Sequence, residues 1–130
     1  MYSAQHENGS VTAFVIVVCS IFLLCTGLVV DGSRVVGAKS EALDLAGNAA
    51  RVGAQQLRSI RSGRNELHVA RAEFAARKYL RAQGASGQVR CDGTSVFVTV
   101  TANVRMTILN IIGVQSKRIT ATQIAMPVDQ

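Results

Sequence analysis

Hydrophobic and polar positions follow three successive patterns along this chain of 130 residues. From Val11 to Val30 the chain is apolar, interrupted only by cysteine, serine, threonine and glycine. Between Leu43 and Ile60, small and apolar residues recur at heptad-like spacing, which indicates an amphipathic helix. From Gln88 onward the period changes to two, which is typical of half-buried strands. This order predicts an α+β fold, in which a transmembrane helix continues into a long amphipathic helix, followed by a second helix and a small three-stranded antiparallel sheet.

The apolar run has the length of a membrane span, because about 20 helical residues cross a hydrocarbon core of roughly 30 Å. The apolar region of a secretory signal peptide is shorter, about 7–15 residues, and follows a positively charged segment. Residues 1–9 contain no lysine or arginine, and bulky Val18 and Leu24 before the two cysteines exclude a lipoprotein signal. A core helix of a soluble protein is the alternative, but it would need a polar stripe at helical spacing, which this run lacks.

The chain divides into four predicted segments. We expect a leader peptide at 1–9, a transmembrane helix at 10–30, an amphipathic stalk helix at 31–61 and a small extracytoplasmic α+β domain at 66–128. Asp31 marks the exit from the hydrocarbon, because an acid is costly inside it. The pair Asp31–Gly32 is the place where we expect a bend in the long helix.

The apolar face of the stalk helix consists mostly of small residues. Its members are Leu43, Ala46, Ala50, Gly53 and Leu57. Small side chains allow another helix to approach closely, so we expect this face to pack against a helix of a different subunit. A solvated stalk is the alternative interpretation.

The second helix and the hairpin have their own sequence signals. Asn65 can cap a helix that runs from Glu66 to Gln83, with Gly84 just beyond its end. The pair Asp92–Gly93 lies between two strand-like runs and predicts a hairpin with a type I′ turn.

Alternation in the following strand separates a buried face from a wet face. The predicted buried face contains Val96, Val98, Val100, Ala102, Val104 and Met106. We expect Val98 and Val100 to lie under the second helix. The connector at 107–113 is either a helical turn or an exposed loop, and a third strand follows at 116–128, ended by Pro127.

The formal net charge of +6 is concentrated in the segment 58–90. The basic residues Arg71, Lys78 and Arg81 could dock lipid headgroups, a wall polymer or nucleic acid. A merely solvated helix face is the alternative. Nucleic acid is the least favoured partner, because the aromatic residues that would stack on bases are few.

The sequence offers little catalytic or metal-binding chemistry. The two histidines, His6 and His68, are isolated, and no glycine-rich phosphate loop is present. Cys91 is the one cysteine outside the membrane segment, so the domain cannot close an internal disulfide. We therefore expect no enzyme activity, no cofactor and no metal site.

The order of segments resembles a known family. A polar leader ends in Gly9 and is followed by SVTAFVIVV, by a helix closing in GLVVDGSR, and by KSEALDLAGNAARVGAQQL. This arrangement resembles the TadE/TadG-like minor pilins and pseudopilins of Tad (Flp-type) pilus systems, especially those of high-GC Gram-positive bacteria. The resemblance spans Asn8 to Leu57 and rests on Gly9–Ser10, Val11, Phe14, Asp31, Arg34 and residues 46–54.

The resemblance implies a structural subunit of a type IV-like pilus or secretion machine. A prepilin peptidase would cut after Gly9 and leave Ser10 as the new N-terminus. The chain would sit in the cell membrane by a single span, with its N-terminus cytoplasmic and its domain outside. A pilus assembly platform would then draw it from the bilayer, and its apolar helix would exchange lipid for other pilin-like subunits.

Two features depart from this picture. Many pilins carry a glutamate at the fifth mature position, where this chain has Phe14, which favours a minor, tip or initiating role. Arg34 and Lys39 follow the span, so the positive-inside rule alone would place the domain in the cytoplasm. The alternatives are therefore a membrane-anchored binding module that uses its basic helix face, and a cytoplasmic structural partner of a secretion complex.

Overall fold

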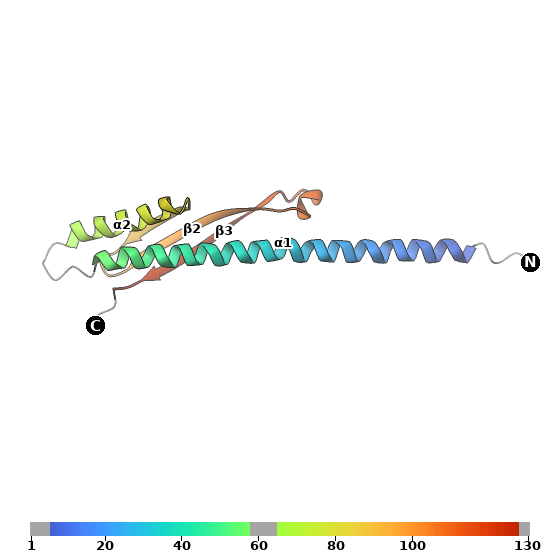
Figure 1. The fold of residues 1–130 in the computed structure, drawn as a ribbon, viewed down its shortest axis with the longest axis horizontal. Helices are drawn as coiled ribbons and strands as arrows, with labels where there is room; N and C mark the ends of the chain where they lie inside the picture. The colour runs from blue at the N-terminus through green and yellow to red at the C-terminus, as the bar shows by residue number, and fades with distance from the viewer. Residues whose placement is uncertain (1–5, 58–64, 128–130) are drawn as a thin grey trace, which may run out of the picture.

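A computed structural model describes residues 6–57 and 65–127 of the chain (Figure 1). Two helices precede an antiparallel sheet, which confirms the predicted α+β class. The elements are α1 (His6–Leu57), α2 (Asn65–Ala82), β1 (Ser86–Cys91), β2 (Val96–Arg105), the 3₁₀ turn η1 (Leu109–Ile112) and β3 (Ser116–Ala125).

Helix α1 is continuous over 52 residues, which corresponds to a length of about 78 Å at 1.5 Å per residue. Its C-terminal part lies along α2 and the sheet, and its N-terminal part extends beyond them (Figure 1). The helix passes through Asp31 and Gly32, so the predicted bend at this pair is wrong. A single glycine costs a helix about 1 kcal/mol relative to alanine, but it leaves the backbone hydrogen bonds intact.

The sheet has the order β1-β2-β3, and both strand pairs are antiparallel. Helix α1 covers β2 and β3, whereas α2 covers β1, and both helices pack on the same face of the sheet. Val98 and Val100 are buried as predicted, but they belong to the strand that α1 covers. The second helix was the wrong element to place over them, because α1 continues beside the sheet to Leu57.

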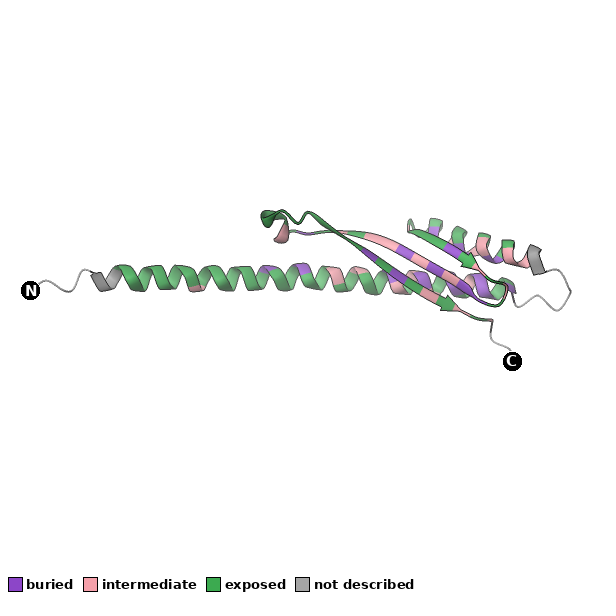
Figure 2. Cartoon of the chain, turned by 180° about the vertical axis from the view of Figure 1, so that it is seen from behind, coloured by how far each residue is buried: buried purple, intermediate pink, exposed green. Residues whose placement is uncertain are grey.

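Alanines of the helices and valines of the sheet make the core (Figure 2). The core residues are Ala42, Ala46, Ala49, Ala50, Ala54 and Leu57 of α1, Ala72, Ala76 and Leu80 of α2, and Val89, Val96, Val98, Val100 and Ala121 of the strands. Residues 42–57 thus belong to the folded domain. The predicted division between a stalk at 31–61 and a separate domain at 66–128 is corrected accordingly.

The two turns on either side of β1 are built differently. After α2, Gly84 has a φ of 65°, and the Ala85 N–H donates to the Leu80 carbonyl at 2.9 Å, as in a Schellman motif. Gly84 therefore ends the helix as predicted, whereas the side chain of Asn65, the predicted cap, lies outside the described residues.

The connection between β1 and β2 is a four-residue loop, so the predicted two-residue turn is wrong. Asp92 Oδ1 accepts hydrogen bonds from the N–H groups of Thr94 at 3.0 Å and Ser95 at 2.7 Å. These hydrogen bonds lower the pKa of Asp92, and the Thr94 N–H has the largest effect. The carboxylate supports the wider loop, and Gly93 supplies a φ of 89° within it.

Candidate functional site: the apolar half of α1 and the loop held against it

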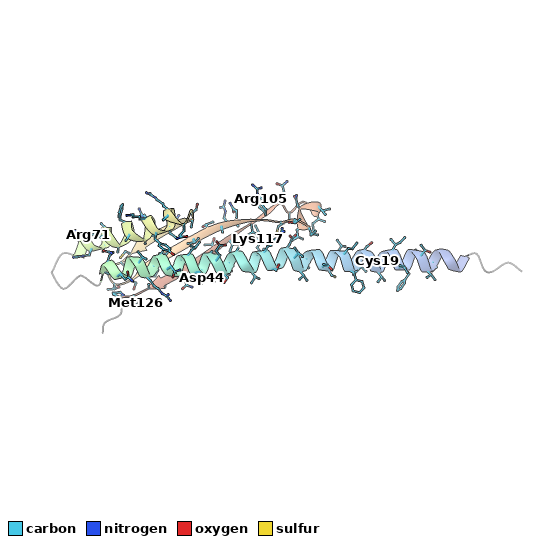
Figure 3. All side chains as sticks on the ribbon, viewed as in Figure 1. Cys19, Asp44, Arg71, Arg105, Lys117 and Met126 are labelled. Atoms are coloured by element: carbon cyan, nitrogen blue, oxygen red, sulfur yellow. The ribbon has the colours of Figure 1, made fainter. Side chains whose placement is uncertain are left out.

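The apolar half of α1, defined as residues 11–30, extends past the sheet with its large side chains exposed (Figures 1 and 2). Phe14 is 69% exposed and Leu23 is 74% exposed, although both are strongly apolar. Cys19 lies on this part of the helix, away from the domain (Figure 3). A surface of this kind is stable only when lipid or protein covers it.

Two hydroxyl side chains of the apolar half, those of Ser20 and Thr26, bond to the helix itself. Ser20 Oγ donates to the Ile16 carbonyl at 2.7 Å, and Thr26 Oγ1 donates to the Phe22 carbonyl at 2.9 Å. A hydroxyl that bonds within its own helix needs no water, so these residues are compatible with a lipid or protein environment. By length and composition, α1 contains a segment able to cross a membrane.

Asp31, the first residue after the apolar half, holds the β2–β3 loop, defined as residues 106–115. Its Oδ1 accepts the Thr107 N–H at 3.0 Å, and its Oδ2 accepts the N–H groups of Ile108 at 2.9 Å and Leu109 at 2.8 Å. The side chain is fully buried by these contacts. The N–H groups of Leu109 and Thr107 lower the pKa of Asp31, because they stabilise its charged form.

Two further contacts fix the loop to α1. Gly27 is buried beneath Ile108, and a β-carbon built on Gly27 would lie 2.5 Å from Ile108 Cγ2. The Arg34 guanidinium donates to the Thr107 hydroxyl. The loop therefore rests on the helix over the turns from Gly27 to Arg34, where the apolar half ends.

This junction was missed by sequence reasoning, which treated Asp31 only as a marker of the membrane exit. The donors lie 76 to 78 residues further along the chain. An isolated aspartate after an apolar run has the same sequence signature whether it faces water or accepts hydrogen bonds. The predicted connector contains the 3₁₀ turn η1, and none of the four η1 residues is buried.

The predicted packing face lies against the chain's own domain. Ala46, Ala50, Gly53 and Leu57 are buried, and Leu43 is partly buried beside them. At Gly53, a β-carbon would lie 3.1 Å from the Ala72 carbonyl oxygen of α2 and 3.0 Å from Val96 Cγ1 of β2. We predicted that a helix of a different subunit packs on this face. In the structure, α2 and the sheet of the same chain occupy it, because α2 runs back along α1.

The other predicted site residues are exposed. Gly9 and Ser10 lie near the beginning of α1, and a β-carbon on Gly9 would meet nothing within 4 Å. Arg71, which is labelled in Figure 3, is exposed on α2, as are Lys78, Arg81 and Phe74, the last of which is 67% exposed. Their spacing places all four on one helix face.

The structure thus defines a class: an α+β protein with one N-terminal helix that is long and apolar enough to cross a membrane. Residues 9–56 match the model of the Tad family, described as Flp pilus-assembly TadE/G-like. The match confirms the resemblance over this segment, which is less than half of the chain, and makes residues 9–56 similar to a pilus-assembly family. No curated protein and no solved structure matches the chain.

Proposed function

We propose that this chain is a minor pilin, or pseudopilin-like structural subunit, of a Tad-type pilus or secretion machine. The observation that carries the proposal is the contrast within α1: residues 42–57 complete the core of the domain, whereas residues 11–30 extend as an uncovered apolar helix. Such a helix can be covered by lipid before assembly and by neighbouring helices afterwards, because both environments are apolar.

In the proposed assembly pathway, the subunit is first inserted in the cell membrane, with the N-terminus cytoplasmic and the domain outside. A prepilin peptidase cuts between Gly9 and Ser10, because a small residue before the bond lets the peptide enter a protease active site at the membrane edge. A pilus assembly platform then removes the subunit from the bilayer. The apolar half of α1 exchanges lipid for the helices of other pilin-like subunits.

A minor rather than a repeating position is proposed because of the apolar half itself. Its residues include no acid, and the fifth position after Gly9 is Phe14. A subunit without an acid there has no carboxylate to pair with the N-terminal amine of a neighbour. It therefore suits a tip or initiating position, in which that contact is made once or not at all.

The decisive experiment is N-terminal sequencing of the protein after co-expression with its own prepilin peptidase. The expected mature protein begins at Ser10, and Gly9→Leu is expected to leave the precursor uncut. Gly37→Leu is the matched control, because a β-carbon at Gly37 also meets nothing within 4 Å. Native protein that still begins at Met1 would remove the main support for a pilin.

Packing of the apolar half can be tested with the native cysteines. Cys19 and Cys25 are exposed on this segment, and Cys91 is half-buried in the domain. A bifunctional maleimide is expected to link Cys19 or Cys25 to pilin partners carrying a cysteine in their own apolar helices. Cys19→Ser/Cys25→Ser should abolish the link while Cys91→Ser preserves it; links that depend on Cys91 alone would place the contact on the domain.

A second candidate function is a membrane-anchored binding module, favoured by the face of Arg71, Phe74, Lys78 and Arg81. An exposed aromatic residue between cations suits an anionic surface such as lipid headgroups or a wall polymer. Charge reversal at Lys78 and Arg81 should abolish binding if this module carries the function. The pilin proposal instead expects assembly to survive these changes, because exposed charges contribute little to a packed contact.

A further inference from the structure

The tip of the β2–β3 loop is apolar and uncovered. Ile111 is 81% exposed, Ile112 is 70% exposed and Val114 is 44% exposed. Residues 106–115 contain no charged side chain. Three large aliphatic residues at one turn are costly to leave in water, because their burial would contribute free energy in proportion to the apolar area covered.

The fold itself does not require these side chains. Asp31 holds the loop through the backbone of Thr107, Ile108 and Leu109, and Ile108 provides the contact with Gly27. Ile111 and Ile112 lie beyond these contacts, in a turn whose four residues are all unburied. Their apolar character is therefore unexplained by the packing of the domain.

The position of the loop along α1 suggests what covers the tip. The β2–β3 tip is the part of the domain that reaches furthest toward the N-terminal end of α1 (Figures 1 and 2). It is fixed to the helix at Gly27 and Asp31, across the boundary where the apolar half ends. Any bilayer that covers residues 11–30 therefore has its surface at the level of this loop.

Basic side chains lie close to the β2–β3 loop, at the expected height of the membrane surface. Arg105 and Lys117 lie at the ends of β2 and β3 next to the loop (Figure 3), and both are exposed, as is Arg118. Arg34 lies one turn beyond Asp31 on α1, where it contacts Thr107. Apolar residues at a tip with cations behind them match the order of acyl chains and anionic headgroups at a membrane surface.

We propose that the β2–β3 loop is a second membrane contact, in which Ile111, Ile112 and Val114 enter the interface of an anionic bilayer. The inference rests on the membrane-inserted stage of the proposed function. The apolar half of α1 anchors the chain, and the loop fixes the tilt and rotation of the domain on the membrane surface. Because Asp31 holds the loop to the helix, the two contacts form one rigid anchor.

Single tryptophans test this placement, since the chain contains none. The full chain is reconstituted into vesicles of phosphatidylcholine and phosphatidylglycerol that carry bromine either high or deep in the acyl chains. Ile111→Trp places the reporter at the tip, Ile21→Trp places it in the middle of the apolar half, and exposed Gln88→Trp places it on β1 as the water control. The tip residue is expected about 5–10 Å into the headgroup and acyl boundary.

The expected result is stronger quenching of Ile111→Trp by shallow bromine, of Ile21→Trp by deep bromine, and of Gln88→Trp by neither. If Ile21→Trp is quenched while Ile111→Trp behaves like Gln88→Trp, the helix spans the membrane but the loop inference is overturned. If Ile21→Trp is also unquenched, membrane anchoring itself fails. Ile111→Trp emission that is unquenched but shifts to the blue with the protein-to-lipid ratio would assign the tip to a protein partner and also overturn the inference.

Discussion

The two halves of α1 invert the usual relation between side-chain size and burial. Between residues 11 and 30 most side chains are large, branched or aromatic, and nearly all of these are exposed. Between residues 42 and 57 the buried face of the helix consists mostly of alanine and glycine. The comparison teaches that the helix buries small residues where a sheet and a second helix must come close. It exposes large ones where lipid or neighbouring helices can adapt to them.

The largest effect is expected when a charged residue is introduced into the buried core and, for comparison, into the exposed apolar half of α1. Val98→Asp buries an unpaired carboxylate beneath α1, which should cost about 3–5 kcal/mol and unfold a domain of ordinary stability. Leu23→Asp lies on the exposed apolar half and should leave the fold in detergent unchanged while impairing membrane insertion. Circular dichroism and membrane fractionation measure the two effects. Unfolding by Leu23→Asp would contradict the division into two halves.

The register of the sheet is tested by the neighbouring position. Thr99 lies on the outer face, where its hydroxyl is 3.0 Å from that of Thr122. Thr99→Asp should therefore be far milder than Val98→Asp in the same urea titration. Equal losses at the two positions would show that the buried face is misassigned.

The second effect concerns the closeness of the two helices. Gly53→Ala places a methyl group against the Ala72 carbonyl and should cost about 1–3 kcal/mol by overpacking. Gly47→Ala is the matched control, because its nearest neighbour would be Gln123 Cγ at 4.0 Å. That control should be neutral or stabilise by about 0.5–1 kcal/mol, as for glycine to alanine within a helix. The denaturant midpoint of Gly53→Ala should fall, whereas that of Gly47→Ala should stay unchanged or rise.

A third effect concerns the contact between the loop and the apolar half. Gly27→Ala should displace Ile108 and destabilise the loop by about 1 kcal/mol or more. Ile108→Ala in the same chain should restore part of the loss, because the smaller side chain makes room for the added methyl group. Loop proteolysis of the two single variants and the double variant measures this coupling. Strict additivity would show that the two residues do not touch.

The smallest effect on global stability is expected from Asp31→Asn, which keeps the shape of the side chain. It replaces a charged acceptor, so amide exchange at Ile108 and Leu109 should accelerate by roughly ten- to hundredfold. The native loop should loosen in acid for the same reason. Because folding lowers the pKa of Asp31, its contribution is complete above the ordinary aspartate range and is lost as the pH falls through the lowered pKa. A variant whose exchange keeps the native acid dependence would contradict this account.

The sequence by itself determined the elements and most of their faces. The apolar run from Val11 to Val30, the end of α2 at Gly84 and the alternation around Val98 each depend on residues close together in the chain. Local periodicity and turn chemistry were therefore sufficient to predict the α+β class and the buried valines. The same local reasoning predicted too short a loop at Asp92–Gly93. The Asp92 side chain accepts hydrogen bonds from residues ahead of it and so stabilises a longer loop than the Asp-Gly pair suggests.

The tertiary structure alone decided what covers each face. The small-residue face around Gly53 could pack closely against any helix or sheet. Which element packs there depends on the path of the chain after α1. Asp31 shows the same limit, since its three donors come from a loop 76 to 78 residues away. A periodic pattern specifies that a face is to be buried, whereas the partner is set by contacts between distant segments, and these leave no local signature in the residues that make them.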